Sequence, residues 1–178
     1  MRKHLAVVIL LMTVNHASVA DNMLELEVTG TITGSTCKVD VSYPGLVKLP
    51  FTSTLTLSKA GDRAVKTPFT VSLTKCSSQS SVSLYFVNDP ARVSAEGRVL
   101  NIVSAGSGVP ANYVELELLN ADSNPVNLAA SKDMQDVGVP TPAASNVVNY
   151  DFFVQYYATG AATAGEVKGS ITFVVESF

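Results

Sequence analysis

Few side chains in this sequence are of the types that do chemistry. There are two cysteines, Cys37 and Cys76, and two histidines, His4 and His16, both within residues 1–20. A cysteine pair can form a disulfide, remain as free thiols or help to bind a metal ion. A metal site would lack a histidine or a third cysteine to complete it. We therefore expect a disulfide, which would close a loop of about 40 residues and contribute roughly 4 kcal/mol in the chain-entropy model.

A pair of carboxylates is the other candidate for chemistry. Glu115 and Glu117 alternate with Val114, Leu116 and Leu118, so both carboxylates lie on one face of a predicted strand. Glycoside hydrolysis would need a cleft that holds sugar between two such groups, whereas this alternation places both on the solvent face. We interpret them as solvated surface charges. Because the chain after residue 20 has no histidine and no Gly-x-Ser-x-Gly motif, we expect no enzymatic activity and no cofactor.

Residues 1–20 have the layout of a secretory signal peptide. Arg2 and Lys3 precede the apolar run Leu5–Met12, and the small residues up to Ala20 offer a cleavage site after that alanine. A membrane anchor is the alternative, but the apolar run is shorter than the ~20 residues that span a bilayer. We expect secretion into an oxidising compartment, where the cysteines would pair, and no membrane span in the mature chain.

The mature chain has the length of one domain and an acidic charge. About 160 residues can bury an adequate core. Loss of the basic residues in the signal peptide makes the net charge more negative than the −3 of the full sequence. Phosphate binding needs a basic surface, so we expect no nucleic-acid partner.

The segment Leu24–Ile32 has the clearest strand pattern. Four of its apolar residues alternate with Glu25, Glu27, Thr29 and Thr31: Leu24, Leu26, Val28 and Ile32. No turn residues separate it from 33–39, and a single run over 23–39 would exceed the usual limit of roughly 10 residues. The pattern predicts that the first half extends beyond its own domain and pairs with the open sheet edge of a neighbouring molecule. An edge strand of a self-contained sandwich is the alternative.

The rest of the chain is predicted to be strands and turns with little helix. We expect strands at 46–49, 69–74, 82–86, 98–103, 114–118, 126–128, 150–157 and 167–175, with a long connection over 121–149. The last two have the strongest inward faces: Tyr150, Phe152, Val154 and Tyr156, then Val167, Gly169, Ile171, Phe173 and Val175. Such short strands, joined by turns and one long-range disulfide, indicate an antiparallel sandwich of immunoglobulin type.

These features together resemble the pilins of the chaperone–usher class, the subunits of type 1 and P-type fimbriae. The resemblance covers the signal peptide, Gly30-Thr31-Ile32 ahead of Cys37, the second cysteine after an apolar strand, and the small-residue segment 157–165. Gly165 stands where this family places the glycine that opens its C-terminal assembly strand. Ser177 departs from the pattern, since an aromatic residue is usual next to the last position.

The resemblance implies an incomplete immunoglobulin-like antiparallel β-sandwich, the pilin fold, with an N-terminal donor-strand extension. The expected parts are a signal peptide (1–20), the extension (21–33) and the pilin domain (34–178). A hydrophobic groove would lie open beside the C-terminal strand until a neighbour fills it. The donor side chains would be Leu24, Leu26, Val28, Gly30 and Ile32, and the assembly strand would carry Gly165, Val167, Ile171, Phe173 and Val175.

The implied function is that of a structural subunit of a chaperone–usher fimbria, which polymerises by donor-strand exchange and supports adhesion. A periplasmic chaperone, an outer-membrane usher and neighbouring pilins would be its partners, on a route through the periplasm to the cell surface. The short extension is most like that of minor tip or adaptor pilins. The alternative is a secreted adhesin or lectin that binds a host receptor through loops such as 105–113 or 121–149.

Overall fold

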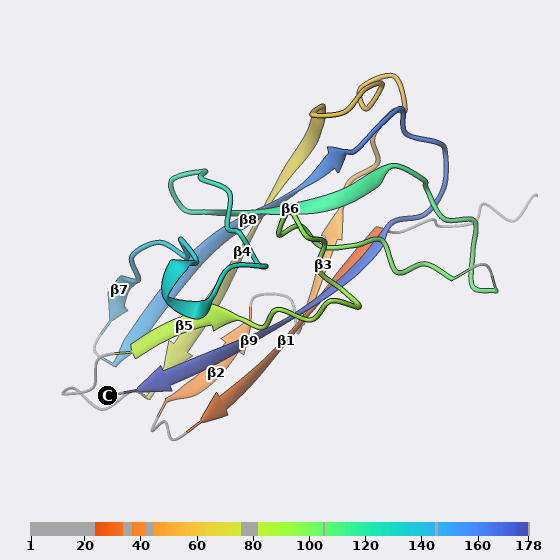
Figure 1. The fold of residues 1–178 in the computed structure, drawn as a ribbon. Helices are drawn as coiled ribbons and strands as arrows, with labels where there is room; N and C mark the ends of the chain where they lie inside the picture. Colours follow the sequence, from red (N-terminus) through yellow and green to blue (C-terminus); the bar gives the residue numbers. More distant parts are fainter. Residues whose placement is uncertain are drawn as a thin grey trace, which may run out of the picture.

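The computed structural model describes residues 24–33, 37–41, 45–75, 82–104, 106–144 and 146–177, and for residues 24, 31–33, 142–144 and 177 the backbone alone. It is a two-layered β-sandwich (Figure 1). The strands are β1 (Leu24–Thr33), β2 (Lys38–Val41), β3 (Leu46–Leu49), β4 (Arg63–Thr74), β5 (Val82–Phe86), β6 (Val114–Asn120), β7 (Thr141–Ala144), β8 (Val147–Ala158) and β9 (Lys168–Ser177). Within the described residues the helical content is one 3-10 turn, η1 (Lys132–Met134).

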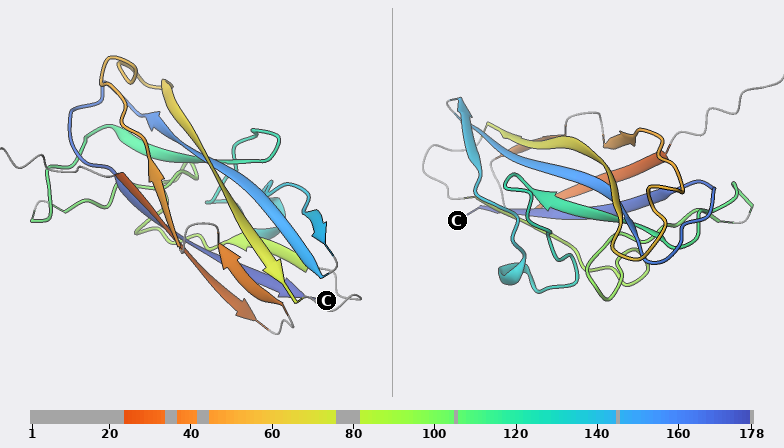
Figure 2. Two further views of the ribbon diagram at one scale, coloured as in Figure 1. Left: turned by 180° about the vertical axis from the view of Figure 1, so that it is seen from behind. Right: turned by 90° about the horizontal axis from the view of Figure 1, so that it is seen from above.

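The two sheets have the strand orders β3-β1-β9-β5 and β2-β4-β8-β6, and β7 pairs with β8 beside the second path. Among the strands of the described residues every pair is antiparallel except β1 and β9, which run parallel from Glu25 opposite Lys168 to Thr33 opposite Glu176. Figure 2 shows β1 and β9 side by side in both views. The expected antiparallel sandwich is therefore confirmed apart from this one pair.

The core lies between the sheets and follows the predicted alternation. Tyr150, Phe152, Val154 and Tyr156 are buried along β8. An aromatic cluster joins the layers at the centre, where Phe152 stacks on Phe69 at 5.4 Å between ring centroids and meets the edge of Phe86 at 5.3 Å. Contacts of this kind stabilise a core beyond the area they bury.

The single extended run predicted over 23–39 is wrong. β1 ends at Thr33, and β2, which begins at Lys38, belongs to the other sheet. The expectation that a lone chain leaves the edge of β9 open is also wrong, since β1 occupies that edge. The physical reason is that β1 and the groove beside β9 have matching apolar faces and belong to one chain. This covalent connection gives β1 a high effective concentration at its own groove, so β1 fills it in the absence of another strand.

Two weak strand predictions are also wrong. In 98–103 Val99 makes isolated bridges to Val93 and Leu116, and Asn101 then diverts the chain because its Oδ1 accepts hydrogen bonds from backbone N–H groups of Val103 and Lys168. In 126–128 the backbone bonds run to separate segments, from Val126 to Leu118 and from Leu128 to Gly97. Neither segment aligns with one neighbour for long enough to form a strand.

The edge of β5 is covered by a side chain instead of a strand. Gln135 is buried, and its amide accepts from the backbone N–H of Phe86 at 2.7 Å and donates to the Phe86 carbonyl at 2.8 Å. The amide also donates to Ala130 O at 3.2 Å. One glutamine thus satisfies the backbone groups that an additional strand would otherwise use.

Gln135→Leu is expected to lower the free energy of unfolding by about 2 kcal/mol, because it leaves the buried N–H and C=O of Phe86 without these partners. Urea denaturation at equilibrium measures the change. Asn88→Ala serves as the control, since it removes an exposed hydrogen bond to Ala129 O from the same region. Equal stability of the two variants would show that Gln135 does not secure this edge.

Candidate functional site: the seat of the N-terminal strand

The candidate site is the groove beside β9 in which β1 lies. The register runs from Glu25 opposite Lys168 to Thr33 opposite Glu176. Leu26 and Val28 are buried between the sheets. Room for Leu26 comes from Gly169, its partner in the register, where an added Cβ would lie 3.2 Å from Leu26 Cδ1 and 2.8 Å from Val99 Cγ1.

Gly30 lies directly against the ring of Phe173. The two residues are register partners, and a Cβ at position 30 would come within 2.7 Å of three ring carbons. Phe173 is fully buried and meets the edge of Phe86 at 6.4 Å between centroids. A side chain at position 30 would therefore displace either β1 or a core aromatic. This steric conflict explains why position 30 is a glycine.

The structure brings together the two segments that the sequence analysis expected to meet in different molecules. On β9 and just before it, Val167, Ile171, Phe173 and Val175 are buried, as predicted. For Leu24 and Ile32 the structure describes only the backbone, which forms part of β1. Their role as donor side chains stays a prediction.

The outer face of the β1–β9 pair is polar. Thr29 Oγ1 lies 3.0 Å from Thr172 Oγ1. Farther toward the start of the pair, Lys168 Nζ lies 3.5 Å from Glu25 Oε2. Because both contacts are exposed, they set the register of the strands more than they add to stability.

Gly165 opens the segment that leads into β9. A Cβ there would lie within 2.6 Å of backbone atoms of Val109, Pro110 and Ala111, so only glycine allows the two segments to approach. Backbone bonds hold them together, from Glu166 N to Val109 O at 2.7 Å and from Ala111 N to Glu166 O at 2.9 Å. The structure thus gives the predicted position of Gly165 a physical basis.

Asn101 secures the same junction, and sequence reasoning missed it. Its Nδ2 donates to the carbonyls of Ala111 and Glu166 at 3.0 and 2.9 Å, and its Oδ1 accepts from Lys168 N at 3.0 Å. A lone asparagine within an apolar segment carries no signal of such a role.

A pocket of about 150 Å³ lies at the start of β9, beyond the first β1–β9 pair. Its lining is largely apolar: Phe51, Leu57, Ala111, Val114, Tyr156, Ala162, Gly165 and Val167 are among its residues. Burial raises the pKa of Tyr156, whose hydroxyl stays protonated and donates to Pro50 O at 3.1 Å. That bond fixes the turn carrying Phe51 at the rim of the pocket.

At the opposite end of β9 an ion pair joins the strand to η1. Lys132 Nζ lies 3.1 Å from Glu176 Oε2, and hydrogen bonding to this carboxylate raises the pKa of Lys132. Because Lys132 precedes Gln135 by one short turn, the same loop holds the edge of β5 and the end of β9.

Cys37, one of the two cysteines of the expected disulfide, lies at this end of the sandwich. Cys37 is buried, with 6% of its surface exposed, and precedes β2, in which Lys38 pairs with Thr74 of β4. Cys76 lies outside the described residues. The β2–β4 register supports the pairing, since it brings Cys37 beside the end of β4, and the bond stays a prediction.

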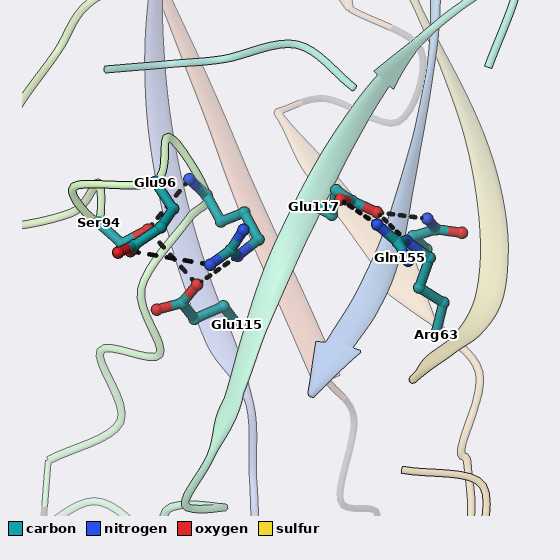
Figure 3. Close-up of polar contacts among 7 residues, drawn as sticks. Arg63, Ser94, Glu96, Glu115, Glu117 and Gln155 are labelled. Carbon is teal, nitrogen blue, oxygen red and sulfur yellow. Dashed lines mark hydrogen bonds and ion pairs between the residues drawn. The ribbon is translucent and has the colours of Figure 1, made fainter. Parts of the chain in front are cut away.

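The interpretation of Glu117 as a solvated charge is wrong. Only 4% of its surface is exposed. Arg63 donates to both of its carboxylate oxygens, at 2.7 and 3.1 Å, and Gln155 Nε2 donates at 2.7 Å (Figure 3). This bonding raises the pKa of the Arg63 guanidinium. The alternation put Glu117 on the outer face correctly, but long neighbouring side chains cover it there.

Glu115 is also bonded to an arginine. Arg98 Nε lies 2.6 Å from Glu115 Oε2, and Figure 3 shows this group beside Ser94 and Glu96. Arg98 and Arg63 both lie over the ring of Tyr157, at 4.1 and 4.8 Å from its centroid. Each carboxylate is thus bonded to its own guanidinium, so the arrangement braces the β6–β8 face and does not form an acid–base pair.

No group of residues within the described ranges has the composition of a metal site. A search of the same ranges finds no helix with the length and apolarity to cross a bilayer.

A protein-family model described as "Fimbrial protein" matches residues 26–177, from the second residue pair of β1–β9 to the end of β9. A crystal structure of an antigen and type I fimbria protein of Burkholderia pseudomallei is 21% identical and covers 86% of this chain and 93% of that one, with a TM-score of 0.46.

The chain is similar in sequence to several fimbrial proteins. It is 34% identical over 169 residues to the major fimbrial subunit SMF-1 of Stenotrophomonas maltophilia (strain K279a), covering 89% of this chain and 94% of that protein. It is 32% identical to the minor fimbrial subunit HifD of Haemophilus influenzae (82% and 69%) and 31% identical to the F17 fimbrial protein of Escherichia coli (82% and 82%).

Proposed function

Because this chain belongs to the fimbrial protein family, we propose that it polymerises by donor-strand exchange, in which β1 leaves β9 of its own chain and takes the corresponding place in the next subunit. The protein is a structural subunit of a fimbrium at the cell surface. The observation that carries the proposal is the β1–β9 pair: a strand near the start of the chain completes a sheet beside the last strand.

The pairing itself favours exchange. Parallel pairing is slightly less stable per residue than antiparallel pairing, and β1–β9 is the one parallel pair among the named strands of the described chain. An incoming strand from another copy can run antiparallel to β9. It can also reach the pocket at the start of β9, which lies beyond the first residue pair of β1.

In the antiparallel direction, the C-terminal end of the donated strand lies at the start of β9. Ile32 would then be the donor side chain nearest the pocket, with Gly30, Val28, Leu26 and Leu24 following toward the end of β9. The same alternating apolar face serves in both directions, since a strand presents every second side chain to one side.

Exchange requires the groove to be protected while β1 is away from it. A periplasmic chaperone would cover the apolar groove, and an outer-membrane usher would be the place where the next subunit replaces it. Residues 1–20, outside the described ranges, would direct secretion. We infer no catalysis, because in this proposal all of the chemistry is strand pairing and burial.

A reversible lock tests the proposal. Thr29 and Thr172 are register partners whose hydroxyls lie 3.0 Å apart, so Thr29→Cys/Thr172→Cys is placed to form a disulfide between β1 and β9 of one chain. The oxidised variant is expected to remain monomeric, and mild reduction is expected to restore assembly into oligomers that resist detergent. Thr29→Ser/Thr172→Ser, treated identically, is the matched control. Assembly of the oxidised variant at the control rate would contradict strand exchange.

A further inference from the structure

One end of the sandwich carries most of the large apolar side chains that the described structure leaves exposed. We call this end the loop pole; it consists of the loops 50–62, 106–113 and 158–167 (Figures 1 and 2). Phe51, Leu55, Val109 and Tyr113 have 68%, 87%, 72% and 60% of their surface exposed there. A gathering of this kind is typical of an interaction surface, whereas single exposed apolar residues are ordinary.

The loops of the loop pole are tied to one another. Thr159 N donates to Tyr113 O at 2.9 Å, and Ala162 N donates to Leu57 O at 2.9 Å. The bonds between Glu166 and the 109–111 segment connect the third loop to the second. The four apolar side chains therefore project from a braced platform that surrounds the pocket at the start of β9.

The short segment between β1 and the rest of the donor subunit determines what can lie against this platform. This step rests on the proposed function: an antiparallel donor strand ends at the start of β9, which is at the loop pole. From Thr33, the end of β1, to Cys37 at the start of the donor's own sandwich, the chain advances four residues, or at most about 14 Å. The body of the donor subunit must then sit directly on the loop pole.

We propose that the loop pole is the docking surface for the body of the next fimbrial subunit, a second copy of this chain, with Phe51, Leu55, Val109 and Tyr113 as its apolar contacts. The copy presents its opposite end, where β2 begins at Lys38 and β4 ends at Thr74. Two different surfaces thus meet head to tail, and repetition of such a contact generates a filament. The strand supplies the connection, and the loop pole sets the angle between subunits.

The test separates strand uptake from body docking. The mature chain, residues 21–178, is refolded with excess labelled peptide of residues 21–33 to measure strand uptake. Assembly of the same chain without peptide is followed by light scattering. Leu55→Ser/Val109→Ser, which leaves the lining of the pocket unchanged, is expected to take up peptide like the wild type and to assemble about tenfold or more slowly. Met134→Ser/Val139→Ser is the matched control, since these side chains are 77% and 86% exposed away from the loop pole.

Thermal unfolding establishes that the variants are folded, and Leu55→Ser alone replaces the double variant should the latter not fold. If the wild type takes up peptide and assembles, and the loop-pole variant assembles as fast as the control, the docking surface is wrong and strand exchange stands. If the wild type does neither, strand exchange is wrong and this proposal falls with it.

Discussion

Gly30→Leu is expected to lower the free energy of unfolding by about 3 kcal/mol, because the new side chain would overlap the buried ring of Phe173. Glu27→Leu, on the exposed face of the same strand, provides a control of the same size that should change stability by less than about 0.5 kcal/mol. Urea denaturation compares the two. We also expect Gly30→Leu to slow assembly about tenfold, since the same strand is donated.

A compensating substitution makes this prediction specific. Phe173→Ala alone is expected to cost about 3–5 kcal/mol through the cavity it leaves. In Gly30→Leu/Phe173→Ala the leucine has the space that the ring vacated, so the double variant should be more stable than the sum of the single effects allows. Strict additivity would mean that these two residues do not share one site.

Replacement of both cysteines by serine is expected to lower the free energy of unfolding by roughly 4 kcal/mol, because the cross-link restricts a loop of about 40 residues in the unfolded chain. Serine is the appropriate substitute, since it is close to cysteine in size. Chemical denaturation of secreted wild type and Cys37→Ser/Cys76→Ser measures the difference. Reduction of the wild type should reproduce it, and thiol labelling of two free cysteines in the untreated protein would contradict the disulfide.

Alternation predicted the buried faces where a strand lies in the middle of a sheet. The inward residues of 150–157 and 167–175 are buried as expected, because each of these strands has a backbone neighbour on both sides. The 98–103 prediction failed since its hydrogen bonds go to three different segments. A pattern of period two reports which side of a strand is apolar, and it does not report whether a neighbour exists.

The N-terminal strand shows the same limit at the functional level. The alternation of Leu26 and Val28 with Glu25 and Glu27 indicated a strand that must be covered, and the structure buries both apolar residues. Which groove covers them is a property of assembly, because the groove of the same chain and that of a neighbour have identical side chains. Sequence could therefore identify both partners of the site without saying that one chain pairs them with each other.

The residues that sequence analysis missed act through backbone contacts. Asn101 and Gln135 bond to main-chain groups, and any segment offers those, so no complementary residue marks the pairing. Glu117 differs from these two residues, because a carboxylate on a strand indicates that a basic side chain could pair with it. That side chain, Arg63, lies 54 positions away in the chain, so the sequence does not identify it. Only the register of β4, β8 and β6 brings Arg63, Gln155 and Glu117 together.

The distance between β1 of one chain and β9 of another in assembled material tests the central proposal most directly. One chain is spin-labelled at position 29 and a second at position 172, and pulsed electron resonance is recorded on mixed oligomers. Strand exchange predicts a short distance between labels that reside on different chains. A chain labelled at both positions is the reference sample. If this reference gives the short distance and the mixed oligomers give only long distances, β1 never leaves its own β9.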